Sequence, residues 1–243
     1  MTSKEILLRF VPCLSSIAQQ YRNNRQAARA KALSLKSMTT IFNDYYENNS
    51  WKDADSRSGV GSNLEATKTI RETIPQLLND LSISSLLDIP CGDFHWMKEV
   101  DLSGIRYIGA DIVEILVNDN NHIYGAENRS FTCIDLTCDT LPKTDMVICR
   151  DALVHLSNEL IICALRNIKH SDAKHLLTTT FPDTQENKDI VTGMWRPINL
   201  TCAPFNLPQP EKLIAEQAVF SEGLPKRNKQ LGLWRIDDIP EFH

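Results

Sequence analysis

A single stretch of the sequence decides the fold: Leu86-Leu87-Asp88-Ile89-Pro90-Cys91-Gly92-Asp93-Phe94-His95-Trp96. It begins within residues 84–89, a short and mainly apolar run typical of a buried parallel strand. The turn that follows contains Gly92, which has no Cβ and therefore lets the backbone approach a ligand closely. Ligands of open parallel sheets bind beyond the carboxyl ends of the strands. The sequence therefore predicts a ligand site directly after this strand.

Four similar runs follow, at residues 107–110, 131–134, 146–149 and 176–180, with helical patterns at residues 113–121 and 158–168 between some of them. Strands that alternate with helices predict βαβ units and a doubly wound, mostly parallel sheet of the α/β class. Residues 212–219 and 231–236 predict two more strands joined by a polar loop. We expect these two strands to form an antiparallel hairpin at one edge of the sheet.

The chain is long enough for one domain with an added segment, because it has 243 residues. Residues 1–40 carry seven Lys or Arg but a single acid, Glu5, although the formal net charge of the whole chain is −5. Apolar residues recur at helical spacing over residues 7–21, and a basic, Ala-rich stretch follows. The sequence therefore predicts a basic helical N-terminal extension over residues 1–40. This extension either packs as a lid on the main domain, residues 41–243, or binds an anionic surface or carrier.

Between the extension and the first strand, residues 53–61 form a polar loop that contains two glycines. Ser62 and Glu65 have the spacing of a capping box, which predicts a helix over residues 63–79.

Composition excludes several classes of protein. The net charge argues against a wholly basic nucleic-acid binder. The seven cysteines form no Cys-x-x-Cys pair, and neither they nor the histidines have metal-ligand spacing, so we expect a reduced, cytoplasmic protein without a metal site. Charged residues interrupt the N-terminal apolar stretch, and no run of 18 apolar residues exists, so we expect neither a signal peptide nor a transmembrane segment.

Carboxylates also stand where the second and third strands end. Asp111 follows Gly92 by 19 residues, at a position where an acidic side chain binds ribose hydroxyls. Asp135 ends the third strand, where it can accept a hydrogen bond from an adenine amino group while Leu136 donates its backbone N–H nearby. The alternative is that both carboxylates only face solvent.

Together, the segment 88–93, Asp111 and Asp135 resemble the successive motifs of class I S-adenosylmethionine-dependent methyltransferases, over roughly residues 60–240. The resemblance implies a seven-stranded sheet with the hairpin at its edge, and S-adenosyl-L-methionine as the cofactor. It also implies that Asp88 holds the amino-acid end, Gly92 lines the methionine portion, and the two later aspartates bind ribose and adenine. The residues predicted to bind the cofactor are Asp88, Pro90, Cys91, Gly92, Asp93, Trp96, Asp111, Ile112, Asp135, Leu136 and Arg150.

The sequence departs from the usual glycine pattern of that family. Pro90 and Phe94 stand where glycines are common, and a proline removes one backbone donor. No Gly-x-Gly-x-x-Gly fingerprint is present, which argues against a nicotinamide-dependent oxidoreductase. Trp96 either lines the cofactor site or packs in the core.

The predicted catalytic residues follow the fourth strand. Asp151 comes directly after Arg150, and His155 lies four residues further on, so in a helix both side chains would point the same way. His155 could remove a proton from an acceptor hydroxyl, with Asp151 or Asp93 orienting it. Alternatively His155 only packs or caps beneath the site, and Arg150 forms a structural ion pair or binds an anionic group.

A long segment, residues 187–206, follows the fifth strand. Its Trp195, Arg196 and Asn199 could bind sugar hydroxyls by stacking and hydrogen bonding, or the segment could be an ordinary proline-held loop. The sequence therefore predicts a methyltransferase that O-methylates a hydroxyl of a small molecule or glycan. The alternative is a non-catalytic or partner-dependent module of the same fold that docks to an anionic partner through its basic N-terminal arm.

Overall fold

A computed structural model describes residues 20–216 and 228–242 of the chain. The chain divides into two compact units, Met1–Ser37 and Met38–His243. Within the first unit, residues 20–33 are helical. Most of the helix predicted over residues 7–21 lies outside the described residues.

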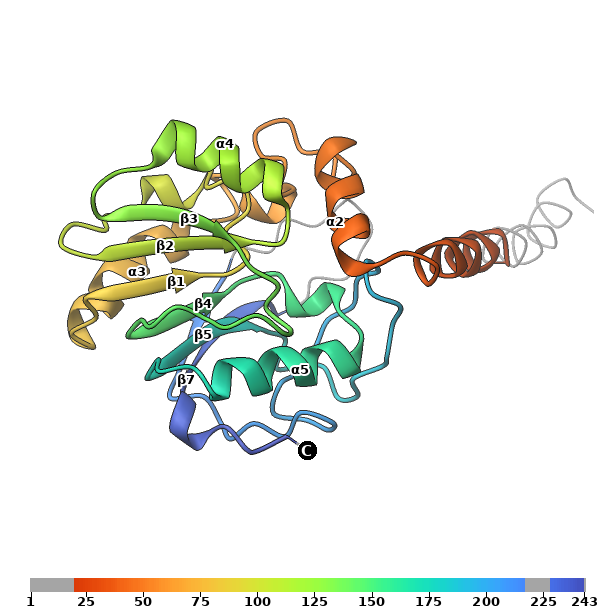
Figure 1. The fold of residues 1–243 in the computed structure, drawn as a ribbon. Coiled ribbons are helices and arrows are strands. Elements are labelled where there is room, and N and C mark those ends of the chain that lie inside the picture. The colour runs from red at the N-terminus through yellow and green to blue at the C-terminus, as the bar shows by residue number, and fades with distance from the viewer. Residues whose placement is uncertain (1–19, 217–227, 243) are drawn as a thin grey trace, which may run out of the picture. The chain divides into compact units, whose positions relative to one another are not determined.

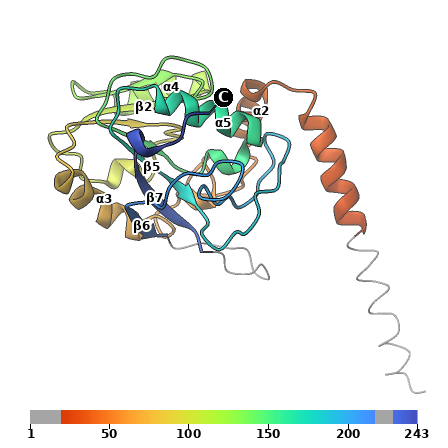
Figure 2. The ribbon, with the colours of Figure 1, turned by 90° about the horizontal axis from the view of Figure 1, so that it is seen from below.

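The second unit is built on a sheet of seven strands in the order β3-β2-β1-β4-β5-β7-β6 (Figure 1). The strands are β1 (Ser85–Asp88), β2 (Arg106–Asp111), β3 (Arg129–Cys133), β4 (Met146–Cys149), β5 (His175–Thr180), β6 (Lys212–Ala215) and β7 (Gln230–Arg235). The first five run parallel, and β7 pairs antiparallel with both β5 and β6. Figure 2 shows this pair at one side of the sheet. The predicted mostly parallel sheet with an antiparallel edge hairpin is confirmed.

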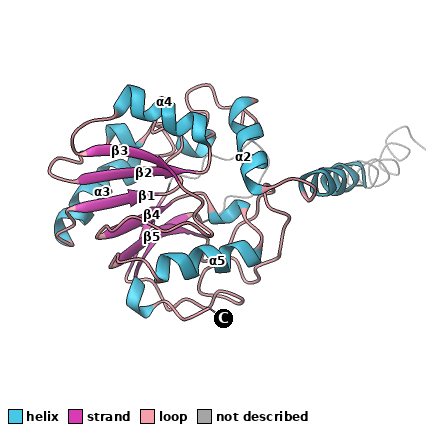
Figure 3. Ribbon diagram, viewed as in Figure 1, coloured by secondary structure: helices cyan, strands magenta, loops and turns pink. Residues whose placement is uncertain are grey.

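The carboxyl ends of the parallel strands meet at one edge of the sheet, which we call the carboxyl edge. Asp88 pairs with Gly109, and Asp111 pairs with Cys133, so β1, β2 and β3 end close to one another. Because β6 runs antiparallel to β7, it also ends at this edge, directly before Glu216. Figure 3 shows the loops that leave these strand ends.

Helices cover both faces of the sheet because buried residues of the strands alternate between the faces. Leu86 packs in a core cluster with α3 (Lys68–Asp80) and α4 (Glu114–Tyr124). Leu87 packs in a second cluster with α5 (Asn158–Lys169) and with apolar residues of the segment 198–207. The short helix α2 (Met38–Glu47) contributes partly buried side chains to both clusters.

The start of α3 differs from the prediction. The helix begins at Lys68 rather than near residue 63, and the expected capping box does not form. Instead, the Asn63 side chain accepts a hydrogen bond from the Ala66 backbone N–H at 2.9 Å, and the Thr67 hydroxyl donates to the Asn63 carbonyl at 2.8 Å. These local bonds hold residues 63–66 in turns and delay the helix by one turn.

Candidate functional site

The turn after β1 lies where the sequence placed it, at the carboxyl edge. Gly92 has φ +54°, a conformation that a residue with a Cβ rarely adopts. A Cβ at this position would also overlap the Ser58 hydroxyl. The Cys91 N–H donates to the Ala110 carbonyl at 2.8 Å, and Asn120 Nδ2 donates to the Gly92 carbonyl at 2.8 Å. The turn is therefore fixed both to β2 and to α4, with Cys91 buried and Pro90 half-buried.

Two buried carboxylates flank this turn. Asp88 is 2% exposed and accepts a hydrogen bond from the Tyr107 hydroxyl at 2.7 Å. Asp111 accepts from the Gly92 N–H at 3.2 Å and from the Val113 N–H at 3.0 Å. Burial raises the pKa of Asp88 to about 7 and that of Asp111 to about 6. A cation placed here would favour the ionised form of both carboxylates.

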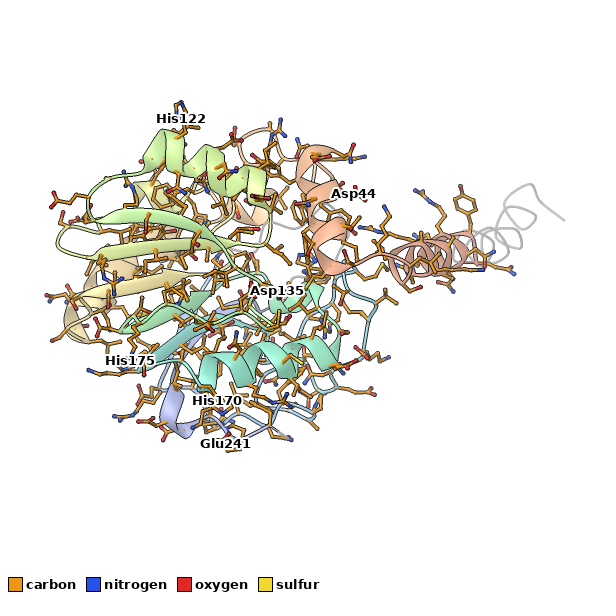
Figure 4. All side chains as sticks on the ribbon, viewed as in Figure 1. Asp44, His122, Asp135, His170, His175 and Glu241 are labelled. Atoms are coloured by element: carbon orange, nitrogen blue, oxygen red, sulfur yellow. The ribbon has the colours of Figure 1, made fainter. Side chains whose placement is uncertain are left out.

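The third predicted carboxylate, Asp135, lies after β3 at the same edge, as Figure 4 shows. It is half-buried, and its Oδ1 accepts from the Thr137 N–H at 2.8 Å and from the Thr137 hydroxyl at 2.6 Å. Leu136 is buried beside it, and Ile112 after β2 is partly buried against the core. The strand order β3-β2-β1 thus places Asp135, Asp111 and Asp88 along one edge of the sheet.

A loop that precedes α3 lies against this row of strand ends. Its residues 56–61, Ser56-Arg57-Ser58-Gly59-Val60-Gly61, are called the strap below. The Asp93 carboxylate accepts hydrogen bonds from the Ser56 hydroxyl at 3.0 Å, the Arg57 N–H at 2.8 Å and the Ser58 hydroxyl at 3.1 Å. Asp93, predicted to bind the cofactor, is therefore occupied by the strap.

A group of ion pairs lies at the carboxyl edge beyond β4, and its Arg150–Glu216 pair is buried. Arg150 Nε donates to Glu216 Oε2 at 3.0 Å, and Lys229 Nζ lies 3.1 Å from the same oxygen and 2.6 Å from Asp151 Oδ2. The Arg150 guanidinium also lies over the Trp96 ring, 5.3 Å from its centroid. We call Arg150, Asp151, Glu216 and Lys229 the ion cluster. Trp96 is buried in the core, directly beneath this cluster.

Asp151 and His155 are not on one helix. Asp151 has φ +55°, and only a short 3-10 turn, Leu153–His155, follows it, because the Asp151 N–H is turned towards the Thr179 hydroxyl at 2.9 Å. Burial disfavours the ionised form of Asp151, but the positive charges of Lys229 and Arg150 outweigh the effect of burial. The pKa of this carboxyl is therefore lowered to about 2. His155 lies close enough to contribute to the same lowering. Asp151 therefore stays ionised across the physiological range.

The His155 ring has a defined orientation. Its Nδ1 lies 2.9 Å from the Met194 carbonyl oxygen, and its ring centroid lies 6.1 Å from that of Trp51. Because a carbonyl only accepts hydrogen bonds, the neutral ring carries its proton on Nδ1, and Nε2 is the basic nitrogen.

Comparison with known proteins identifies the fold. No protein-family model matches the sequence, and no curated protein does. Among solved structures, magnesium protoporphyrin IX methyltransferase from Synechocystis superposes with a TM-score of 0.53 with bound S-adenosylmethionine and 0.54 with bound S-adenosylhomocysteine. The match to the structure with S-adenosylmethionine has 16% identity and covers 82% of this chain and 96% of the Synechocystis chain. The match to the structure with S-adenosylhomocysteine has 14% identity and covers 81% of this chain and 98% of the other. The chain has the fold of class I S-adenosylmethionine-dependent methyltransferases.

A second methyltransferase structure agrees with this result. Human N-acetylserotonin methyltransferase in complex with S-adenosylmethionine superposes with a TM-score of 0.50 at 14% identity over 70% of this chain. The match spans only about half of the human protein, 52% of its length.

The loop after β5 of this methyltransferase fold contains the predicted acceptor-binding residues. Trp195 is 44% exposed, and its ring makes an edge contact with Phe181, with 6.0 Å between centroids. Arg196 is buried, its pKa is lowered to about 10 by that burial, and its guanidinium donates to the Leu153 carbonyl at 3.1 Å. Asn199 donates to the Pro182 carbonyl at 3.0 Å. Trp195 thus faces outward, while Arg196 and Asn199 hold the loop in place.

Sequence reasoning missed the strap, Glu216 and Lys229. The strap carries a signal in its small residues, Ser58, Gly59 and Gly61, which suit close approach to another backbone. Glu216 and Lys229 carry no local signal, because Arg150 and Asp151, with which they pair, lie 66 and 78 residues earlier in the chain.

Two further features concern only residues 20–216 and 228–242. In this part of the chain, no group of His, Cys, Asp and Glu side chains is arranged to hold a metal ion. No helix among the same residues has the length and apolar character needed to cross a membrane. His122 and His175 lie away from Asp135, on the far side of α4 and at the amino end of β5 (Figure 4).

Proposed function

We propose that this protein is an S-adenosylmethionine-dependent methyltransferase whose cofactor binds at the carboxyl edge of the sheet. One observation carries the proposal: the buried carboxylates Asp88 and Asp111 flank the glycine turn of a methyltransferase fold. The Synechocystis and human proteins of this fold were solved with S-adenosylmethionine or its product bound. In the proposed site Asp88 binds the amino-acid end, Asp111 the ribose, and Asp135 with Leu136 the adenine.

We also propose that the acceptor is a hydroxyl of a small molecule or glycan. When bound, the cofactor supplies a methyl group on a sulfonium, which is already a good leaving group. His155 Nε2 removes the proton of the acceptor hydroxyl, and the permanently ionised Asp151 favours the imidazolium that results. Trp195 offers an exposed ring on which a sugar or another flat acceptor can stack.

Cofactor binding is the first test of this function. Wild-type protein is expected to bind S-adenosylhomocysteine in a calorimetric titration, and Asp111→Ala is expected to weaken binding at least about tenfold, because it removes the acceptor for ribose hydroxyls. Asp238→Ala, which removes an exposed carboxylate in the short turn after β7, is the matched control and should leave the affinity unchanged. Absence of wild-type binding, or unchanged binding by Asp111→Ala, contradicts the proposal.

The affinity should also depend on pH through Asp88, whose pKa is raised to about 7 by burial. The ammonium group of the ligand favours the carboxylate, so affinity for S-adenosylhomocysteine is expected to rise about tenfold from about pH 6 to about pH 8. The stability of the ligand-free protein should change in the opposite direction. The pKa of Asp88 in the folded protein lies above its ordinary value of 3.8, so the free energy of unfolding should fall as the pH rises from 3.8 through about 7.

The Asp88→Asn variant checks this assignment, since it removes the titrating group but keeps an acceptor for the Tyr107 hydroxyl. The affinity of this variant for S-adenosylhomocysteine should vary much less between about pH 6 and 8. The variation that remains should come from Asp111, whose pKa is about 6. An unchanged pH profile in this variant would assign the dependence to another group.

The alternative of a partner-dependent module rests on the helical residues 20–33. Arg22, Arg25, Arg29 and Lys31 are all exposed on this helix. Exposed cations along one helix suit an anionic surface or carrier. This alternative becomes the better explanation if the wild-type protein fails to bind S-adenosylhomocysteine.

A further inference from the structure

We propose that the strap closes over the methionyl end of the cofactor and that Asp93 is the positioning residue that holds it there. The inference rests on the proposed function, because it assumes that the cofactor occupies the carboxyl edge. It gives the strap a role, and it replaces the predicted direct contact between Asp93 and the cofactor by an action of Asp93 through the strap.

One end of the strap is fixed by Asp93. Besides the three hydrogen bonds from the strap described above, the Asp93 carboxylate accepts one from the His95 N–H at 3.3 Å. The backbone N–H of Asp93 donates to the Ser58 hydroxyl at 3.0 Å. Ser56 is 2% exposed, and its hydroxyl oxygen also accepts from the Ser58 N–H at 3.1 Å. Donors of the protein thus occupy this carboxylate, so it acts on the cofactor through the strap.

The other end of the strap is fixed by the ion cluster. Arg150 Nη2 donates to the Gly61 carbonyl at 2.7 Å, and a Cβ on Gly61 would lie 2.9 Å from Asp151 Oδ2. In between, Gly59 has φ +94°, and a Cβ there would lie 2.8 Å from the Trp51 Cβ. An added side chain at either glycine would therefore clash with a neighbouring residue, so the path of the strap is tightly constrained.

The strand order shows which part of the cofactor the strap would cover. Its two anchors follow β1 and β4, which are adjacent in the sheet. The proposed ribose and adenine ligands, Asp111 and Asp135, follow β2 and β3 on the other side of β1. At the β1 end, Ser58 lies directly against Gly92, the residue assigned to the methionine portion. The strap therefore spans the methionyl end and leaves the adenosine end to other residues.

The experiment compares two ligands that differ only at that end. S-adenosylhomocysteine carries the amino-acid chain, whereas methylthioadenosine has a methyl group in its place. Asp93→Asn and Ser58→Ala each remove part of the strap anchor, and each is expected to weaken S-adenosylhomocysteine binding about ten- to a hundredfold in calorimetric titrations. Binding of methylthioadenosine is expected to change less than about twofold. Asp101→Asn, on an exposed turn, is the matched control and should change neither affinity.

Each outcome decides the question. Selective loss for S-adenosylhomocysteine supports the inference, whereas equal losses for both ligands, or none, overturn it. If Asp93→Asn does not fold, the milder Ser58→Ala variant carries the comparison. Failure of the wild-type protein to bind either ligand would instead reject the proposed function, so the two failures are distinguishable.

Discussion

Replacing His155 by Gln is expected to lower kcat for methyl transfer to a hydroxyl acceptor by about 10²- to 10⁴-fold, the contribution of a general base. The ring is held with Nδ1 on the Met194 carbonyl, so in the proposed reaction Nε2 is the nitrogen that would take the proton. Glutamine can keep a hydrogen bond to that carbonyl but cannot accept a proton near neutral pH. The measurement is transfer of a labelled methyl group to an acceptor found by screening hydroxylated small molecules and glycans with the wild-type protein.

Two controls separate catalysis from structure. The dissociation constant of S-adenosylhomocysteine should be unchanged in His155→Gln, so that the variant loses kcat without losing the cofactor. His170→Gln changes an exposed histidine paired with Glu241 at 3.7 Å and should have wild-type kcat. Wild-type kcat in His155→Gln would show that this histidine only packs beside Trp51.

The sheet was predictable because its signals are local. The runs that became β1 and β4 consist of buried residues, and the sequence shows them directly as short apolar segments. Parallel strands end at the same edge, so carboxylates that terminate successive strands must lie near one another. This reasoning placed Asp88 and Asp111 at the edge where the Gly92 turn begins, and in the structure Asp88 ends β1 while Asp111 accepts from the Gly92 N–H. Their assignment to parts of the cofactor stays a prediction.

The rest of the site depends on contacts between distant parts of the chain. Nothing near Arg150 indicates that its partner is Glu216, because the pairing exists only once β6 lies at the edge of the sheet. The same limit applies to Asp93, whose strap partners precede it by up to 37 residues. Local competition explains the late start of α3, where the Asn63 side chain and backbone hold a turn that the capping-box spacing did not predict.

The ion cluster leads to the largest expected effect on stability. Arg150→Met is expected to lower the free energy of unfolding by about 3–5 kcal/mol, because it leaves the buried Glu216 carboxylate without its main partner. The side chains of Arg150 and Glu216 are 3% and 0% exposed, and Glu216 Oε1 has no hydrogen-bond partner within residues 20–216 and 228–242. Lys229 also contacts Asp151, so it cannot fully replace the guanidinium. Urea denaturation measures the change.

The double variant Arg150→Met/Glu216→Leu distinguishes an unpaired charge from lost packing. Removing both charges leaves the Lys229–Asp151 pair balanced, so most of the lost stability should return, as for other buried ion pairs replaced by apolar residues. Lys143→Met, which breaks the exposed 2.8 Å pair with Asp172, is the control and should leave the urea midpoint within error of wild type. If the double variant is as unstable as Arg150→Met, the guanidinium stabilises the fold through its contacts with Trp96 and the Gly61 carbonyl rather than by neutralising Glu216.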